Sequence, residues 1–262
     1  MSQENLISKA IIANYSQKLI DYLTMDVALV GGGPSALVAA AELAKKGYKV
    51  AIFERSLAPG GGIWGGGMLF NEVVVQDSAA NYLQNIGIHL RNLEEAPGYF
   101  MLDSVEMASG LIFNAMKTGA KIFNSVCVED IVFKENKVNG LVINWNNVRK
   151  LGQPVDPLTI IAKVVVDATG HPCEIIRIAT EKARISIDTE TGKVMGERPM
   201  WVENGEDETV KSTKEYYPGL FACGMSASNV TGSYRMGPIF GGMILSGIKV
   251  AEQIDAKLKA EK

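Results

Sequence analysis

The sequence predicts an α/β fold organised around a central parallel sheet, and two observations support this prediction. Residues 27–30 and 49–53 are short apolar runs separated by a glycine turn and a helical pattern. A strand–helix–strand unit of this kind is right-handed and places its two strands parallel in one sheet. Residues 163–167 and 219–223 are further apolar runs, with the near-continuous hydrophobicity that is typical of buried parallel strands.

An amphipathic helix is predicted within residues 1–24, packed ahead of the main domain. Its apolar residues recur at three- and four-residue spacing and therefore share one face: Ile7, Ile11, Tyr15, Leu19 and Tyr22. A second helix follows residues 27–30, since alanine and leucine recur at helical spacing between residues 36 and 44. Lys45 and Gly47 are typical of the end of such a helix.

The middle of the chain predicts a helix and a hairpin. Residues 104–117 have a helical pattern that ends before a glycine. Residues 126–134 and 138–145 are apolar runs on either side of Glu135-Asn136, which predicts an antiparallel hairpin. This hairpin would be an antiparallel β insertion in the parallel sheet.

The last quarter predicts a polar segment and a closing helix. Residues 190–217 are polar and rich in charge, which favours an arm or lid. Residues 238–258 have the pattern of a long helix. Since the chain contains no internal repeat and no low-complexity tract, residues 1–262 are predicted to form a single domain.

Composition and charge exclude several classes of protein. Of the 262 residues, 47% are hydrophobic and 21% are charged, which indicates a globular core and not a disordered chain. The net charge of −3 provides no electrostatic footprint for nucleic acid or for an anionic membrane, so neither partner is expected. The first residues lack a basic region and a small-residue cleavage site, which predicts a cytoplasmic protein. Three cysteines without paired spacing predict reduced thiols: Cys127, Cys173 and Cys223.

A glycine motif after the first predicted strand indicates a dinucleotide site. In Gly31-x-Gly33-x-x-Ala36, the first glycine permits a tight turn and the second lets a pyrophosphate approach the backbone. The N-terminus of the following helix then faces the phosphate charge. Glu54 ends the second strand, where a carboxylate can accept both ribose hydroxyls and repel a 2′-phosphate. The motif therefore predicts NAD in preference to NADP.

Residues 60–67 contain six glycines around Ile63 and Trp64. A backbone without Cβ atoms can lie close to a ligand, so this segment, which includes Gly62, is a candidate binding loop. A mobile surface loop is the alternative interpretation.

Two later segments resemble motifs of FAD-dependent oxidoreductases of the glutathione reductase fold. They are residues 164–170, which end in Asp167-Ala168-Thr169-Gly170, and residues 217–224, which end in Cys223-Gly224. The resemblance implies a glutathione-reductase-like dinucleotide-binding fold. In those flavoproteins an aspartate follows the glycine and binds the flavin side of the cofactor, whereas here Met225 follows Gly224. A thioether cannot replace that acceptor, so the fold is expected without flavin chemistry.

The chain has two histidines. His171 follows a predicted strand and turn, at the carboxyl edge of the sheet where open α/β folds bind ligands. His89 lies between apolar residues and is interpreted as structural. Asp156 lies 15 residues before His171, and on spacing alone an aspartate before a proline is usually a turn residue.

The whole chain resembles the thiamine thiazole synthase family, through four motifs that extend over nearly all of its length. They are residues 60–68, Val155-Asp156-Pro157, Thr169-Gly170-His171 and residues 235–241. The resemblance implies that NAD and glycine are converted to ADP-5-ethyl-4-methylthiazole-2-carboxylate with release of nicotinamide. NAD would then be a substrate and not a recycled cofactor.

The resemblance also implies roles for single residues. Asp156 and His171 would bind iron(II), with Asp156 reaching the site of a neighbouring subunit, and both would be catalytic. Two protein ligands hold iron weakly, so the metal is expected to be lost easily. Arg235 would bind the glycine carboxylate. The implied NAD contacts, besides Gly31 and Gly33, are Ser35, Glu54, Arg55, Gly62, Val128, Pro154, Val155, Asp156 and Met225. A homo-octamer is expected from the same resemblance.

The sulfur source is where the chain departs from the eukaryotic branch of that family. Those members resemble Cys-Met-Asp-Pro and give up the cysteine sulfur in a single turnover, whereas this chain has Pro154-Val155-Asp156-Pro157. The archaeal branch that lacks this cysteine uses free sulfide and turns over repeatedly, which is the prediction for this chain. Cys173, two residues after His171, is the alternative donor, because a thiolate beside iron would be activated.

Two other functions remain as alternatives. One is an FAD-dependent oxidoreductase of the same fold, against which Met225 argues. The other is a non-catalytic NAD-binding protein, which accounts for Glu54 and the glycines but gives Asp156, His171 and Arg235 no common purpose.

Overall fold

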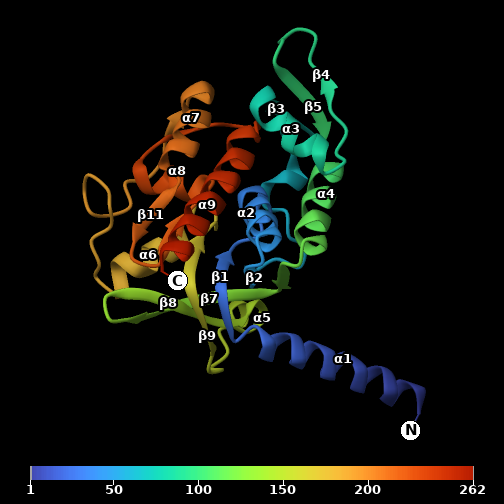
Figure 1. Ribbon diagram of the computed structural model, residues 1–262, viewed down its shortest axis with the longest axis vertical. Coiled ribbons are helices and arrows are strands. Elements are labelled where there is room, and N and C mark those ends of the chain that lie inside the picture. Colours follow the sequence, from blue (N-terminus) through green and yellow to red (C-terminus); the bar gives the residue numbers. More distant parts are fainter. Residues whose placement is uncertain (1, 262) are drawn as a thin grey trace.

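The computed structural model describes residues 2–261 and has an eight-stranded sheet at its centre (Figure 1). Six strands lie in the order β11–β12–β9–β1–β2–β6, in which β12, β9, β1, β2 and β6 pair in parallel. Their bounds are Lys214–Tyr217 for β11, Leu220–Ala222 for β12, Leu158–Asp167 for β9, Thr24–Val30 for β1, Val50–Glu54 for β2 and Lys121–Asn124 for β6. The predicted α/β fold with a central parallel sheet is confirmed.

The central strands are apolar on both faces because both faces are covered. Val27 and Leu29 of β1 belong to one core cluster, and Ala28 and Val30 belong to the other. Since successive side chains of a strand point to opposite faces, each strand contributes to both layers. This burial explains why the strands are recognisable in the sequence as short continuous apolar runs.

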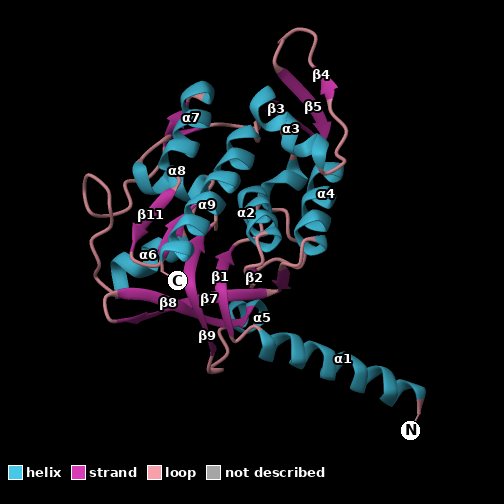
Figure 2. Ribbon diagram, viewed as in Figure 1, coloured by secondary structure: helices cyan, strands magenta, loops and turns pink. Residues whose placement is uncertain are grey.

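Three helices cover one face of the sheet (Figure 2): α2 (Pro34–Lys45), α4 (Ser104–Lys117) and α9 (Gly241–Ala260). A Cβ atom at Gly247 of α9 would lie 2.5 Å from the carbonyl oxygen of Ser35, so the absence of a side chain permits the close contact between α9 and α2. The predicted closing helix at residues 238–258 thus packs directly on the helix that follows the glycine motif.

The hairpin β7 (Val126–Lys134) and β8 (Lys137–Trp145) lies over the other face, with α5 (Asn146–Leu151) and α6 (Glu174–Lys182). β8 pairs antiparallel with β9, as the predicted β insertion requires. Glu135 and Asn136 both have positive φ, 53° and 56°, which is the backbone of a two-residue hairpin turn matched to strand twist.

Several smaller elements were not expected from the sequence. They are η1 (Gly61–Gly65), α3 (Asp77–Asn85), α8 (Met225–Thr231), the three-stranded sheet of β3 (Glu72–Gln76), β4 (Arg91–Asn92) and β5 (Tyr99–Asp103), and the parallel pair of β10 (Arg198–Met200) and β13 (Tyr234–Arg235). The pair β10–β13 is the most relevant to function because it carries Arg235.

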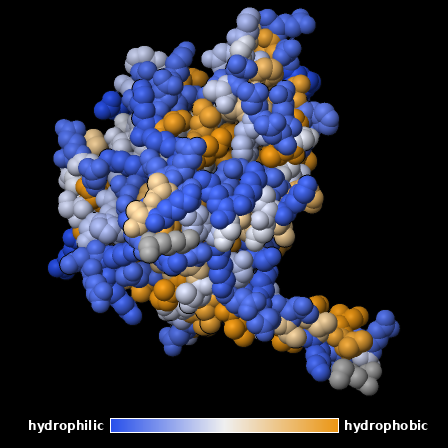
Figure 3. All heavy atoms as spheres, in the orientation of Figure 1, coloured by the Kyte–Doolittle hydropathy of each residue, from blue (hydrophilic) through white to orange (hydrophobic). Residues whose placement is uncertain are grey.

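The N-terminal helix differs from the expectation that it packs ahead of the domain. α1 (Gln3–Asp21) projects away from the body, and hydrophobic residues lie exposed along it (Figures 1 and 3). Ile7 and Ile11 are exposed, whereas Tyr15 and Leu19, near its end, pack against the core. Helical spacing predicts an apolar face but does not determine what covers that face. Among residues 2–261, none of the helices combines the length and apolar character that a membrane crossing requires.

The segment 190–217 was expected as an arm or lid, and the structure contradicts this for its second half. α7 (Val202–Ser212) contributes buried residues that include Glu206 and Thr209, and β11 joins the central sheet. Polar composition concealed these elements because the buried face of α7 is itself polar. The Thr209 hydroxyl, for example, donates to the carbonyl oxygen of Gly205 at 2.7 Å.

Candidate active site

A cavity of about 620 Å³ opens at the carboxyl ends of β1, β2 and β9. This is the position at which open α/β sheets bind ligands. Ten of the residues predicted from the sequence line it: Gly31, Gly33, Ser35, Glu54, Arg55, Gly62, Val128, His171, Met225 and Arg235. The fold therefore brings the predicted nucleotide residues and two of the predicted reaction residues to one cavity.

The glycine turn between β1 and α2 forms one wall of the cavity. Gly31 has a φ of 94°, and a Cβ atom there would lie 2.4 Å from the carbonyl oxygen of Ala168, so a larger residue does not fit. Gly33 is the N-cap of α2, and a Cβ atom there would meet nothing within 4 Å. The N-terminus of α2 is thus open to an anion such as a pyrophosphate.

Glu54 is buried at the end of β2 and is held by two backbone donors. Its Oε2 accepts from the Gly32 N–H at 2.6 Å, and its Oε1 accepts from the Ser56 N–H at 2.6 Å. An ionised carboxylate has about four lone-pair directions, so two hydrogen bonds leave acceptor capacity for a ligand. The glycine turn and the acidic residue are therefore one preorganised unit.

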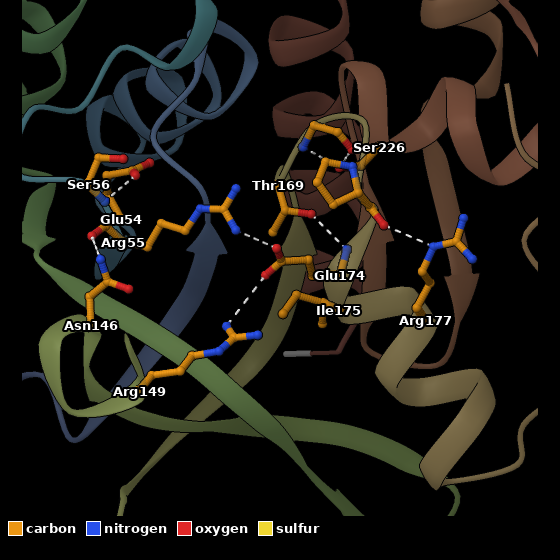
Figure 4. Close-up of polar contacts among 12 residues, drawn as sticks. Glu54, Arg55, Ser56, Asn146, Arg149, Thr169, Glu174, Ile175, Arg177 and Ser226 are labelled. Atoms are coloured by element: carbon orange, nitrogen blue, oxygen red, sulfur yellow. Dashed lines mark hydrogen bonds and ion pairs between the residues drawn. The ribbon is translucent and has the colours of Figure 1, made fainter. Parts of the chain in front are cut away.

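A second charged group beside Glu54 links β2 to α6 (Figure 4). Arg55 donates to Glu174 Oε1 at 2.5 Å, and Arg149 of α5 lies 3.9 Å from Glu174 Oε2. Asn146 donates to the carbonyl oxygen of Arg55 at 2.7 Å. These contacts connect the cavity wall to the hairpin layer and fix the backbone at Arg55.

The turn that carries His171 is held by a fully buried acid at the end of β9. Asp167 Oδ2 accepts from the backbone N–H groups of Ile175 and Ile176, at 2.9 and 3.0 Å. Its Oδ1 accepts from the Thr169 hydroxyl and from the Ser226 hydroxyl, at 2.7 and 2.9 Å. Asp167 thus anchors both ends of the segment between β9 and α6, and it acts as a structural acid.

His171 and Arg235 line the part of the cavity wall that the glycine turn and Glu54 do not supply. The side chain of His171 is half exposed, and its Nδ1 lies 2.5 Å from Glu197 Oε1. Arg235 is an exposed residue of β13, in register with Met200 of β10. Backbone pairing between β10 and β13 therefore connects the segment that carries Glu197 to the strand that carries Arg235.

The loop that contains Asp156 does not line this cavity. Pro154, Val155 and Asp156 are exposed, and Asn144 Nδ2 donates to the carbonyl oxygen of Val155 at 3.1 Å. Within residues 2–261, no group of three or more histidine, cysteine or acidic side chains is arranged to hold a metal ion. In one copy of the chain, His171 lines the cavity and Asp156 does not.

All three cysteines are free and buried. Burial raises the pKa of the Cys173 thiol well above its ordinary value, and the charge of Asp167 raises this pKa further. Burial also raises the pKa of Cys223, which lines the cavity. Cys173 does not line the cavity, so it lacks both the access and the thiolate character of a reactive cysteine.

Comparison with known proteins gives a consistent result. The model of the Thi4 family matches residues 8–240. The chain belongs to this family. Thiamine thiazole synthase of Methanothermobacter thermautotrophicus is 48% identical over 253 residues, which cover 97% of each chain. Thiamine thiazole synthase of Thermococcus kodakarensis is 51% identical over 252 residues, which cover 96% of this chain and 97% of the relative.

Among solved structures, the crystal structure of Thermovibrio ammonificans THI4 superposes with a TM-score of 0.96 at 50% identity, over 99% of this chain and 100% of that one. A geranylgeranyl bacteriochlorophyll reductase-like protein of Thermoplasma acidophilum has a TM-score of 0.54 at 17% identity, which shows a shared fold alone. The resemblance to thiazole synthases is confirmed, and the relatives support an enzyme of thiamine biosynthesis.

The cavity of this family member also bears on the flavin alternative. Met225, the residue that the sequence weighs against flavin, begins α8 and lines the cavity. Its thioether is a weak acceptor, so the side chain at this position offers a ligand no carboxylate.

Sequence reasoning missed the residues that orient the site. Glu197 contacts His171 across 26 positions, and Asn229 donates to the carbonyl oxygen of His171 at 2.6 Å across 58 positions. No local pattern surrounds either residue. The only signal in the sequence was that Glu197 follows a glycine in a charge-rich segment, which is equally typical of a solvated loop.

Proposed function

We propose that this member of the Thi4 family is an iron(II)-dependent, sulfide-using thiamine thiazole synthase. It converts NAD, glycine and free sulfide to ADP-5-ethyl-4-methylthiazole-2-carboxylate and releases nicotinamide. NAD is cleaved, its ribose is isomerised and condensed with glycine, and the product is sulfurated and cyclised. The observation that carries the proposal is that one cavity is lined by Glu54, His171 and Arg235.

The glycine turn and Glu54 support NAD as the substrate. The open N-terminus of α2 suits the pyrophosphate, and Glu54, held by Gly32 and Ser56, presents its remaining lone pairs to the two ribose hydroxyls. A 2′-phosphate at this position would meet a buried negative charge, which disfavours NADP. This half of the cavity binds and orients the nucleotide.

The other half supports glycine and a metal. Arg235 offers a planar donor fork for the glycine carboxylate. His171 uses Nδ1 for Glu197, so Nε2 is the nitrogen that would bind iron(II), and Asp156 of a second copy would provide the oxygen ligand. This donor chemistry fits iron(II). When bound, the ion would supply a Lewis-acid centre with open positions for the substrates.

Residue 154 supports free sulfide as the sulfur source. Proline has no sulfur to give, and Cys173 is buried, protonated and outside the cavity. The chain therefore has no thiol at the family's donor position, and external sulfide permits many turnovers.

The exposed Asp156 loop supports an oligomer in which sites are shared between copies. Asp156 lies outside the cavity that His171 lines, and the apolar face of α1 is left exposed by the rest of the chain. A homo-octamer, as the family resemblance implies, would supply a neighbouring copy whose site Asp156 could reach and against which the apolar face of α1 could pack.

The test is mass spectrometry of the small molecules released after anaerobic incubation with NAD, glycine, iron(II) and sulfide. The proposal expects ADP-thiazole carboxylate in excess of protein. Product formed without added sulfide, and limited to one per chain, would show that the sulfur comes from the protein. NAD that remains intact under all conditions would instead support a non-catalytic binding protein, and bound flavin would support an oxidoreductase.

A further inference from the structure

Each of the two histidines has a glutamate at its Nδ1 atom, but the two pairs have different surroundings. His171 Nδ1 lies 2.5 Å from Glu197 Oε1, and the side chain of Glu197 is 15% exposed. His89 Nδ1 lies 2.6 Å from Glu106 Oε1, and the side chain of His89 is 90% exposed. Only the first pair borders the cavity. The second is an ordinary surface contact and provides a matched control within the same chain.

Glu197 is held in place by hydrogen bonds from the residues on either side of it. The Gly196 N–H donates to the carbonyl oxygen of Asn229 at 3.0 Å, and the Arg198 N–H donates to that of Ser233 at 3.0 Å. Asn229 also donates through Nδ2 to the carbonyl oxygen of His171 at 2.6 Å. Asn229 therefore fixes the backbone of both partners, so the contact between the two side chains is built into the fold.

The contact has a chemical consequence for the imidazole ring. A carboxylate can only accept, so Nδ1 carries the proton that is donated to Glu197. In the neutral ring, the lone pair then belongs to Nε2. Histidines that bind metals commonly donate their other N–H to a carboxylate, which fixes both the tautomer and the direction of the ring.

We propose that Glu197 is the positioning residue of His171: it selects the tautomer with the proton on Nδ1 and aims Nε2 into the cavity as the ligand atom. The part of this inference that concerns iron rests on the proposed function. The part that concerns the tautomer rests only on the contact between the two side chains.

The first experiment observes the tautomer in the full-length protein without metal. Nitrogen-15 NMR of labelled histidine, at about pH 8 where an ordinary imidazole is neutral, separates the two ring nitrogens, and His89→Gln assigns the signals. We expect the Nδ1–H form for His171, a shift towards the Nε2–H form in Glu197→Ala, and retention of much of the Nδ1–H form in Glu197→Gln, whose amide oxygen still accepts. Glu106→Ala should leave the His171 signals unchanged.

The second experiment measures iron(II) binding by anaerobic titration, with NAD affinity and thermal melting as controls. Loss of an outer-shell partner typically weakens metal binding by about 10- to 100-fold, and we expect this for Glu197→Ala, with partial recovery in Glu197→Gln. The NAD affinity and the melting temperature of both Glu197 variants should match those of the wild type. Glu106→Ala should bind iron(II) as tightly as the wild type does.

The outcomes separate the inference from the function on which it builds. If Glu197→Ala keeps the tautomer, or loses NAD binding and melting temperature together with metal, Glu197 does not position His171 and the inference is wrong. If Glu197→Gln loses iron as completely as His171→Asn, Glu197 is itself a ligand, which also overturns the inference. If the tautomer shifts as expected but the wild type binds no iron, the positioning role stands and the proposed iron site fails.

Discussion

The two ends of the cavity are built in different ways. At the nucleotide end, Gly31, Gly33 and Glu54 come from one strand–helix–strand unit, and backbone N–H groups hold the buried carboxylate. At the reacting end, His171, Glu197 and Arg235 come from distant segments, and His171 and Arg235 are half or more exposed. The nucleotide residues are therefore encoded locally, whereas the arrangement of His171, Glu197 and Arg235 depends on tertiary contacts and, under the proposed function, the site also needs a second copy. Mutations at the two ends should accordingly separate binding from chemistry.

The largest expected effect is that of His171→Asn on product formation. Replacing the proposed metal ligand itself should lower the rate by more than about 100-fold, which is the upper end for loss of an outer-shell partner. Binding of NAD should change by no more than about twofold, because hydrogen bonding at Glu54 is untouched. Product yield by mass spectrometry and NAD affinity by calorimetry check the two halves. If His171→Asn lowered NAD affinity as much as product yield, His171 would not be separable from the nucleotide residues, which would contradict the division of the cavity into a nucleotide end and a reacting end.

The shared-site hypothesis predicts complementation between two inactive variants. Asp156→Asn and His171→Asn should each be inactive alone. In co-expressed mixed oligomers, about one quarter of the sites would combine an intact His171 from one copy with an intact Asp156 from another, so about a quarter of wild-type activity should return. A mixture that stays inactive would place both residues in the same chain's site, and an Asp156→Asn variant that is active alone would remove Asp156 from the site.

The nucleotide end should respond to Glu54→Gln with a weaker change. Removing the charge leaves one backbone donor, at Gly32 or Ser56, facing an amide NH₂ group, and costs about 1–3 kcal/mol of stability and NAD binding. Discrimination against NADP should fall as well, because the repulsion of a 2′-phosphate is lost. Asp188→Asn, which removes a pair between Lys214 and a largely exposed carboxylate, is the control and should change stability by less than about 1 kcal/mol.

The same contrast explains which parts of the fold and of the candidate site could be predicted from the sequence. The glycine turn, Glu54 and the hairpin at Glu135-Asn136 were predicted because each depends on neighbours within a few tens of residues. Glu197 was not predicted, because its partner is set by how the segment after α6 passes across α8.

Two larger elements show the same limit of sequence patterns. The exposed face of α1 has a clear apolar periodicity, but periodicity does not specify a partner. In α7, buried Glu206 and Thr209 pair with polar groups, so a buried helix has the composition of a solvated arm. Hydrophobic patterning detects elements that bury apolar side chains, and it misses those that bury paired polar ones.

The smallest expected effect is at Cys173, close to His171 in sequence but outside the cavity. The high pKa of its buried thiol keeps it protonated at neutral pH, so Cys173→Ala should leave the rate with sulfide within about twofold of wild type. Removing one buried sulfur costs about 1–2 kcal/mol of stability, which a thermal melt would detect. Intact mass after turnover provides the decisive readout, because a sulfur donor loses its sulfur. A wild-type chain lighter by one sulfur, together with an inactive Cys173→Ala variant, would identify Cys173 as the sulfur donor in place of external sulfide. The reacting end of the cavity would then include Cys173 as well as His171.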